Sequence, residues 1–488
     1  MFRERSAFKL LQFEYLGFAA FYVWHLVINQ SSDQAFAMTA LLGGGQAVFF
    51  AGALAISLLF IYWSPKDKEK RSLAYARLTH ITYLLGVLGA IVTLIVLIPN
   101  LPGPMVFITT LITGITCGAF EITWFVKIAM LPPLSMQANI FAMTALGTLV
   151  AFLLGFIPIP QVRAIIIAAL LLVSIVFLRL ISHEQTETQG DLIVKQSTDD
   201  QLKLGRQALI RMLLAGLVFS FVFYLTKPLV TSGLLTETSS TWRLWSKLLV
   251  AAVLFAFMLF NHPLQTSSLF RIAMPVSVIG FGLALIDSQS FAGLSYFVIS
   301  AGNKLFDLLI TVFILRAIYQ LGLEPYKYAA IWAGIRFFAG FAGLLGSELI
   351  LDALDAGLIQ ITVLIPAVIC LLVVFFAWLM PESLIERIFE PFAPESKPAE
   401  EQINVSTQES DDQRVTLNLQ RIAEEKHLTP RETEVLALLA QGRSLAVIME
   451  RLSISQGTAQ SHKTNIYRKL DVHSQQELIG LIRDNDNL

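Results

Sequence analysis

The sequence predicts an all-α protein: a twelve-helix transmembrane bundle arranged as six helices plus six, followed by a small soluble four-helix domain. Of the 488 residues, 55% are hydrophobic and only 15% are charged, which is too apolar for a soluble protein of this length. Apolar runs long enough to cross a bilayer recur about twelve times before residue 381. The last stretch of the chain instead carries the capping signals of short soluble helices.

The apolar runs define the membrane domain, 1–381. Each is long enough to span the hydrocarbon core as a helix. The expected spans are 10–29, 36–62, 76–98, 105–131, 135–157, 162–181, 208–231, 243–261, 270–286, 293–320, 327–347 and 357–380.

The charges of the loops between these spans predict the orientation. The loop 64–77 holds five Lys or Arg, and the connection after the sixth run holds Lys195, Lys203 and Arg206. Other loops hold none: 29–35, 99–104, 287–292 and 347–356. Because basic loops stay in the cytoplasm, both termini are expected there, with the bundle in a bacterial inner membrane. The connection with Arg243 and Lys247 fits this rule less well.

The longest polar break, 182–207, separates two halves of six spans, about 1–181 and 208–381. Two such halves joined by a cytoplasmic loop resemble the major facilitator superfamily in their architecture. The glycine-acid-arginine signature that the family usually carries between spans two and three is absent, and WSPKDKEKR stands there instead. This departure puts a transport cycle in doubt more than the fold.

Polar and ionisable side chains inside the apolar runs are the candidate ligand contacts, because such groups are costly at bilayer depth and tend to face cavities. For each of them a structural role is the alternative: Lys304 and Asp307 can form a pair within one helix, and Lys127 can reach the membrane interface. The 35 Phe, 11 Tyr and 7 Trp favour an apolar or aromatic ligand. The candidates are Trp24, His25, Gln46, Glu121, Trp124, Lys127, Asn139, Lys227, Asn303, Lys304, Asp307, Trp332 and Arg336.

The two cysteines, Cys117 and Cys370, lie inside apolar runs, so we expect them to pack between helices rather than to form a disulfide. No metal-ligand spacing, phosphate-binding loop, dinucleotide fingerprint or nucleophile triad is apparent. The sequence therefore predicts neither a metal, a cofactor nor an enzyme.

After residue 381 the composition changes. Leu384, Ile385, Ile388 and Phe389 indicate a short amphipathic helix at the membrane surface. The segment that follows is rich in Pro, Glu, Ser, Gln and Asp, so 382–427 is predicted to be a juxtamembrane helix and an acidic linker.

The final segment, 428–488, has the start signals of four helices. Thr429 and Glu432 form a capping box around Pro430, and Ser444 opens a second helix. Ser455 opens a third, and Ser474 begins the fourth. The tight turn 453–455 between helices two and three predicts a helix-turn-helix, in which the second member enters a DNA major groove.

The third of these helices has two different faces. Ala459, Ile466 and Leu470 fall on one stripe and are expected to pack inward. The other face carries hydroxyl, amide and cationic groups that suit base edges and phosphates. The candidate DNA contacts are Thr458, Gln460, Ser461, His462, Lys463, Thr464, Asn465, Arg468 and Lys469.

These residues carry a resemblance. The run LTPRETEVLALLAQGRS, then IMERLSISQGT, then SHKTNIYRKLDVHSQQELI is similar to the LuxR/FixJ-type DNA-binding domain over its whole length. The family implies binding to double-stranded DNA as a homodimer on an inverted repeat, with the fourth helix, around 475–483, as the dimer contact. Ala459 stands where the family usually has Val, and Gln460 where it often has Lys or Arg. A degenerate protein-binding module is the less favoured alternative.

Together these features predict a membrane-embedded one-component transcription regulator, in which the membrane domain senses a small molecule and controls DNA binding. Two alternatives remain: a secondary transporter with a regulatory DNA-binding appendage, and a membrane scaffold whose helix-turn-helix binds protein.

Overall fold

A computed structural model describes residues 10–35, 45–64, 71–96, 101–181, 199–231, 236–259, 266–286, 291–379, 421–422, 426–440, 449, 452, 456–470, 472 and 477–478. The chain divides into two compact units, Met1–Ala393 and Pro394–Leu488. Every regular element within the described ranges is helical, as predicted.

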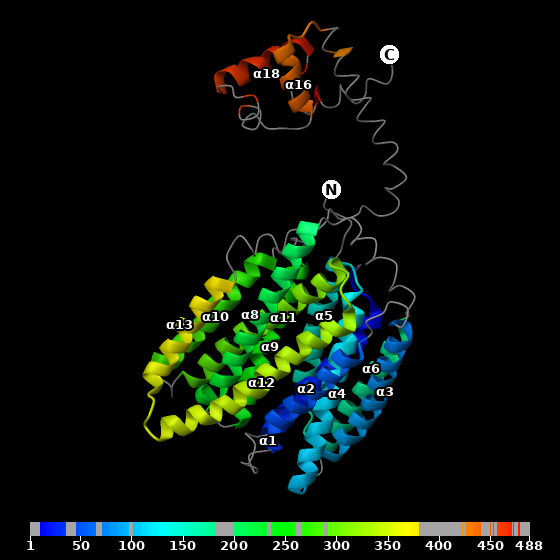
Figure 1. Ribbon diagram of the computed structural model, residues 1–488, viewed down its shortest axis with the longest axis vertical. Helices are drawn as coiled ribbons and strands as arrows, with labels where there is room; N and C mark the ends of the chain where they lie inside the picture. Colours follow the sequence, from blue (N-terminus) through cyan, green and yellow to red (C-terminus); the bar gives the residue numbers. More distant parts are fainter. Residues whose placement is uncertain are drawn as a thin grey trace. The chain divides into compact units, whose positions relative to one another are not determined.

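The first unit holds two sets of helices that follow each other along the chain (Figure 1). A short 3-10 turn, Phe13–Tyr15, precedes the first set. That set is α1 (Leu16–Ala35), α2 (Gly45–Trp63), α3 (Arg71–Val96), α4 (Gly103–Ala129), α5 (Pro133–Leu154) and α6 (Pro160–Leu180). The second set is α8 (Asp199–Thr231), α9 (Thr236–Leu259), α10 (Thr266–Ile286), α11 (Ala292–Gln320), α12 (Pro325–Asp355) and α13 (Ile361–Leu379).

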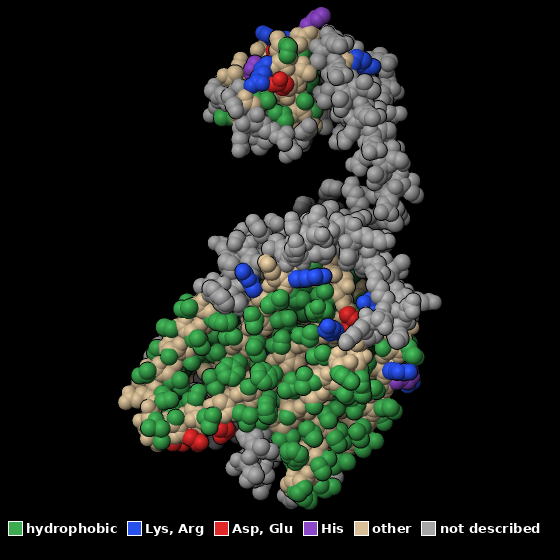
Figure 2. Space-filling view, viewed as in Figure 1, with side chains coloured by type: hydrophobic (Ala, Val, Ile, Leu, Met, Phe, Trp, Pro, Cys, Tyr) green, Lys and Arg blue, Asp and Glu red, His purple; other side chains and the backbone are tan. Residues whose placement is uncertain are grey.

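The surface of this unit is suited to lipid. Among the described residues, 8 helices are long and apolar enough to cross a membrane, and shorter apolar stretches lie at Phe13–Ile28, Leu244–Leu254, Pro275–Leu285 and Ile361–Phe375. Figure 2 shows hydrophobic side chains over most of the visible face of these helices, with charged groups near their ends. The unit is therefore a multi-pass membrane domain, while the exact number of crossings stays a prediction.

Several predicted boundaries differ from the structure. α8 begins at Asp199, so part of the predicted loop 182–207 is helical, and 182–198 lies outside the described residues. α12 continues to Asp355 and takes in most of the predicted loop 347–356. α9 begins at Thr236, which places Lys247 well inside a helix rather than near its start. These helices continue into polar sequence beyond the apolar core of the bilayer. Hydropathy detects only the apolar part of a helix, so it does not predict these ends.

Helices of the membrane unit pack closely where small residues allow it. α2 packs against α4 in its own half and against α12 of the other half, and α5 packs against α9. A Cβ at Gly114 of α4 would lie 2.1 Å from the Phe49 carbonyl oxygen of α2. Glycine therefore sets how near these two helices can approach, which is a common device in membrane bundles.

The second unit contains α16 (Pro430–Ala440) and α18 (Gln456–Leu470), packed against each other. Val435 and Leu436 of α16 meet Ile466 and Leu470 of α18 in a shared hydrophobic core. Ile422, which was assigned to the linker 382–427, is buried in the same core, so the folded part begins before 428. The other two predicted helices lie mostly outside the described residues, and the four-helix prediction is not tested.

Candidate ligand cavity and DNA-recognition helix

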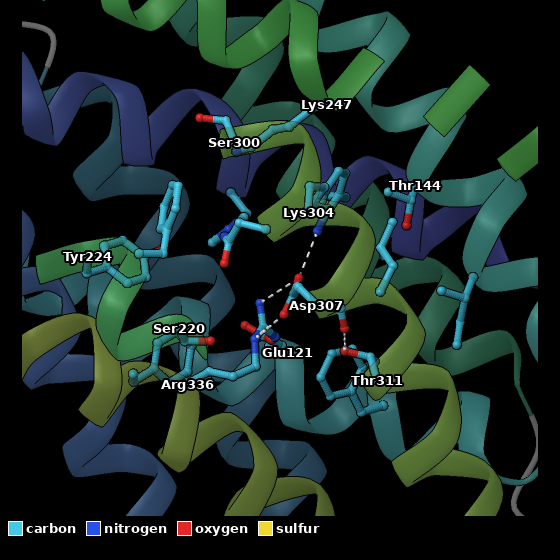
Figure 3. Close-up of a pocket in the computed structure, with 18 of the residues that line it drawn as sticks. Glu121, Thr144, Ser220, Tyr224, Lys247, Ser300, Lys304, Asp307, Thr311 and Arg336 are labelled. Atoms are coloured by element: carbon cyan, nitrogen blue, oxygen red, sulfur yellow. Dashed lines mark hydrogen bonds and ion pairs between the residues drawn. The ribbon is translucent and has the colours of Figure 1, made fainter. Parts of the chain in front are cut away.

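A cavity opens between the two halves of the membrane unit (Figure 3). The cavity volume is about 110 Å³. One water needs roughly 10–15 Å³ on the same measure, so the cavity is large enough for a small molecule. α1, α2, α4 and α5 of the first half and α8, α9, α11 and α12 of the second contribute to its wall. The lining residues are Phe18, Phe21, Tyr22, His25, Phe50, Glu121, Phe125, Ile140, Thr144, Ser220, Phe223, Tyr224, Lys227, Lys247, Ser300, Asn303, Lys304, Asp307, Leu308, Thr311, Arg336 and Phe337.

α11 presents a polar stripe to this cavity. The stripe consists of Ser300, Asn303, Lys304, Asp307 and Thr311, and all five residues line the cavity. Their spacing of three or four residues puts them on one face of the helix. The rest of α11 is mostly apolar and buried, so this one face brings the polar groups together.

An ion-pair network crosses the cavity from one half to the other (Figure 3). Arg336 of α12 pairs with Glu121 of α4, and its Nε lies 2.8 Å from Oδ1 of Asp307 on α11. Lys304 Nζ lies 3.1 Å from Oδ2 of the same aspartate. The four side chains balance two positive with two negative charges, which is what burial away from water requires.

A second polar contact also joins the halves. Lys227 of α8 donates a hydrogen bond of 2.7 Å to the side-chain oxygen of Gln46 on α2. Within the first half, His25 Nδ1 lies 2.9 Å from the Cys117 sulfur, linking α1 to α4. These contacts fix the polar lining to helices of both halves, so a relative movement of the halves would change the cavity.

Aromatic rings make up much of the remaining wall. They come from both halves and include Phe18, Phe21, Tyr22, Phe223 and Phe337. Lys304 Nζ lies 5.1 Å from the centre of the Tyr22 ring, within the range of a cation–π interaction. The cavity thus combines apolar, aromatic walls with a few converging polar groups, as ligand sites commonly do.

The structure brings seven of the thirteen candidate ligand residues into this lining: His25, Glu121, Lys227, Asn303, Lys304, Asp307 and Arg336. Gln46 is not part of the lining, but its side-chain oxygen accepts a hydrogen bond from Lys227, which is. Trp24 and Trp124 are fully buried elsewhere, and their indole N–H groups donate to Thr93 and Ser174.

The remaining candidates also have structural positions. The indole N–H of Trp332 donates to the Thr311 hydroxyl. The guanidinium carbon of Arg336 lies over the Trp332 ring, 5.7 Å from the ring centre. The amide of Asn139 donates to the backbone oxygen of Leu10. Lys127 is buried and is not part of the lining. Trp332, Asn139 and Lys127 therefore lie outside the lining, and a buried polar group such as those of Trp332 and Asn139 can find its hydrogen-bond partner on a neighbouring segment instead.

Seven polar lining residues were missed by sequence reasoning: Tyr22, Thr144, Ser220, Tyr224, Lys247, Ser300 and Thr311. A signal existed for several of them. Ser300 lies one turn from Asn303 and Lys304, while Ser220 and Tyr224 lie two turns and one turn before Lys227. Extending each charged position by one helical turn would have found Ser300 and Tyr224, and a second turn would have reached Ser220.

The C-terminal unit confirms the two faces of α18. Ala459, Ile466 and Leu470 are buried, whereas Thr458, Gln460, Ser461, Thr464 and Arg468 are exposed. His462, Lys463 and Asn465 are intermediate. The face proposed to touch DNA is therefore open to solvent within this unit.

The start of α16 follows the predicted capping box. The backbone N–H of Thr429 donates to the Glu432 carboxylate at 2.9 Å, and the N–H of Glu432 donates to the Thr429 hydroxyl at 3.3 Å. These reciprocal bonds satisfy two backbone donors that the first turn of a helix leaves open.

Lys469 was predicted to contact a DNA phosphate, but in the structure its side chain bonds within the C-terminal unit. Its ammonium group lies 2.8 Å from the Glu432 carboxylate and donates to the His427 carbonyl at 3.0 Å. Burial by itself raises the pKa of Glu432, but the hydrogen bonds from Lys469 and Thr429 outweigh it and hold the pKa below its usual range. Lys469 thus ties α18 to the start of α16.

Glu432→Gln is expected to lower the stability of the C-terminal unit by about 1 kcal/mol at neutral pH, because the charge-assisted bond to Lys469 is lost. Since the folded pKa is depressed, this stabilisation is present above the unfolded value of about 4.3 and disappears as pH falls through the folded value. Hydrogen exchange of α16 and α18 amides at a series of pH values measures it. A difference between the two proteins that persists at the lowest pH would contradict the role of the carboxylate charge.

Thr464→Ala and Arg468→Ala are each expected to weaken sequence-specific DNA binding by about 1–3 kcal/mol if these side chains contact bases. Thr433→Ala is the matched control. The Thr464 hydroxyl donates to the Gln460 carbonyl and the Thr433 hydroxyl to the Thr429 carbonyl, so each change removes the same kind of local bond. Titration of the full chain with its selected DNA measures the effect, and equal losses for Thr464→Ala and Thr433→Ala would place recognition on another face.

Fold and geometry define the class of protein: a helical membrane domain with an internal polar cavity, continuous with a small helix-turn-helix domain. Comparison with known proteins agrees. Residues 426–482 match the family described as bacterial regulatory proteins, luxR family. This segment is a LuxR-type DNA-binding domain.

Two curated relatives match this same end of the chain. The uncharacterized response regulatory protein YgeK of Escherichia coli is 44% identical over 59 residues, which are 12% of this chain and 40% of that protein. The transcriptional regulatory protein MctR of Rhizobium johnstonii is 43% identical over 56 residues, 12% of this chain and 25% of the relative. The chain therefore spans less than half the length of each.

The membrane unit resembles solved transporters. The proton:xylose symporter XylE, of the major facilitator superfamily, superimposes with a TM-score of 0.52 at 15% identity, covering 77% of this chain and 96% of the symporter. This likeness shows the fold. The chain is thus a LuxR-type helix-turn-helix domain fused to a membrane domain of the major facilitator fold.

Proposed function

We propose that the protein is a membrane-embedded one-component transcription regulator, in which a small molecule in the cavity controls DNA binding by the C-terminal domain. The observation that carries the proposal is the presence, in one chain, of a DNA-binding domain and a polar cavity bridged by ion pairs between two halves. A ligand that prefers one arrangement of the halves by 1–3 kcal/mol, a typical coupling energy, would change the affinity for DNA about 5- to 150-fold.

DNA binding requires the C-terminal domain to lie on the cytoplasmic side. The loop charges and the even number of predicted spans favour cytoplasmic termini in a bacterial inner membrane. With Cys117 and Cys370 replaced by serine, Asn487→Cys is expected to resist a membrane-impermeant maleimide in intact cells and to react after permeabilisation. Leu358→Cys, exposed between α12 and α13, is the control on the other side and should react in intact cells. Labelling of Asn487→Cys in intact cells would end the proposal.

The proposed DNA-bound state is a homodimer. Between 428 and 488 the numbers of basic and acidic residues are equal, so a single copy has little net attraction for the phosphate backbone. Two copies on an inverted repeat would add their contacts, with half-sites about 34 Å apart.

Selection of genomic fragments by the full chain in native membrane vesicles tests the regulator proposal. An enriched inverted repeat is expected, and a promoter that carries it should respond to compounds in a reporter screen. The response should be lost in Asp307→Asn, whose carboxylate lies in the ion-pair network. No enriched sequence, even when the chain is artificially dimerised, would favour a scaffold that binds protein.

Transport is the second candidate, favoured by the fold. It requires accumulation of a substrate in vesicles that depends on Glu121 or Asp307, since these carboxylates lie in the cavity. Compound-dependent DNA occupancy without accumulation would separate the regulator from the transporter. We propose no enzymatic activity.

A further inference from the structure

Three polar side chains that line the cavity have an atom without a hydrogen-bond partner among the described residues. These atoms are the hydroxyl oxygens of Thr144 and Ser300 and the side-chain oxygen of Asn303. Thr144 and Ser300 are only 2% and 4% exposed. They come from opposite halves of the unit, α5 and α11, and Figure 3 shows both among the side chains around the ion-pair network.

Other hydroxyls of this unit behave differently. Those of Thr82, Thr93, Thr148 and Thr226 each donate to the carbonyl four residues earlier, at 2.7–3.1 Å. That local bond is the ordinary solution for a threonine in a membrane helix. A buried polar atom without a partner costs free energy, so three of them around one cavity point to a missing polar partner.

The charges of the lining indicate the kind of partner. Four cationic side chains, Lys227, Lys247, Lys304 and Arg336, face two carboxylates, Glu121 and Asp307. Arg336 is already engaged by both carboxylates, whereas among the described residues Lys304 pairs with one carboxylate and has three ammonium donors. Within a bilayer, where charge is poorly solvated, this excess of positive groups among the described lining residues favours an anionic guest.

We infer that the cavity binds a small organic carboxylate with an aromatic or apolar body; this inference rests on the proposed function and names its ligand class. The carboxylate binds where Ser300 and Lys304 lie one turn apart on α11, accepting from the hydroxyl and the ammonium group. Thr144 and Asn303 bond the other polar groups of the ligand. The ring or alkyl body packs against aromatic residues such as Phe21 and Phe337.

Binding to the full chain in nanodiscs tests the ligand class directly. The probes are benzoate, 4-hydroxybenzoate and 3-phenylpropanoate, each compared with its neutral amide, and benzylamine as the cation. At least one carboxylate is expected to bind in the millimolar range or tighter and about tenfold more tightly than its amide, as loss of a charge-assisted hydrogen bond predicts. No binding of any carboxylate up to about 10 mM, or tighter binding of the amides or the amine, overturns the inference.

Thr144→Val and Ser300→Ala locate the site. Ser300→Ala should weaken every carboxylate that binds about tenfold, because a hydrogen bond to a charged group is removed. Thr144→Val should weaken 4-hydroxybenzoate, whose hydroxyl group Thr144 bonds, more than benzoate, which has no second polar group. Each variant should leave the ligand-free melting temperature unchanged or raised, since neither hydroxyl has a hydrogen-bond partner among the described residues. Thr148→Val is the matched control, one turn along α5, buried and bonded to the Thr144 carbonyl, and should not change carboxylate affinity. Unchanged affinity in both cavity variants places the anion elsewhere and overturns the site.

A parallel measurement of DNA occupancy separates the two proposals. Carboxylate binding that leaves DNA occupancy unchanged supports the ligand class and contradicts the control mechanism. A response of DNA occupancy to a neutral or cationic compound, lost in Ser300→Ala, supports the control mechanism and overturns the carboxylate.

Discussion

Arg336→Met is expected to lower the free energy of unfolding of the membrane unit by about 3–5 kcal/mol, the cost of removing one partner from a buried ion pair. Arg336 contacts both Glu121 and Asp307, whose side chains are only 7% and 12% exposed. Methionine fills similar volume but leaves both carboxylates without their shared cation. Only Asp307 keeps another, through Lys304.

Thermal unfolding in detergent, followed by the reactivity of the buried Cys117 in a Cys370→Ser background, measures this loss. The double variant Arg336→Met with Glu121→Gln is the control. The second substitution removes the carboxylate of Glu121, which has no other cation in the network. Much of the lost free energy of unfolding should therefore return in the double variant. A single variant as stable as the parent protein would show that the network does not hold the halves together.

Ile466→Ala is expected to destabilise the C-terminal unit by about 2–5 kcal/mol and so to abolish DNA binding. Ile466 is fully buried between α16 and α18, and truncation leaves a cavity in a small core. For a domain of this size, the loss is a large part of the total stability.

Thr464→Ala, on the opposite face of the same helix, separates folding from recognition. It should weaken DNA binding while the amides of α18 remain protected from exchange. Ile466→Ala should lose protection and binding together. Protection that survives in Ile466→Ala would contradict the orientation of α18.

The helices of the membrane unit could be predicted because bilayer thickness imposes long apolar runs. The prediction failed where helices extend into polar sequence, as in α8 from Asp199 and α12 to Asp355. One consequence is that Lys247 was not predicted as a site residue. It was assigned near a helix start, but it lies inside α9 and lines the cavity.

The ligand site could be predicted only in part. Lys304 and Asp307 are three residues apart on one helix, so their pairing follows from local spacing. Arg336 and Glu121 are 215 residues apart, and no local pattern joins them. Asn139 and Trp124 carry the same polar signal in the sequence, yet both satisfy their hydrogen bonds away from the cavity.

The sequence by itself determined the division into a membrane part and a DNA-binding part, the helical class of both, and the two faces of α18. These properties depend on periodicity and capping, which act over a few residues along the chain. Only the tertiary structure decided which buried polar groups meet in the cavity, that Lys469 braces α16, and that Thr144 and Ser300 find no hydrogen-bond partner in the part of the chain that the structure describes. Those outcomes depend on how distant helices pack, because a polar side chain in a membrane helix bonds to whichever neighbour comes within reach.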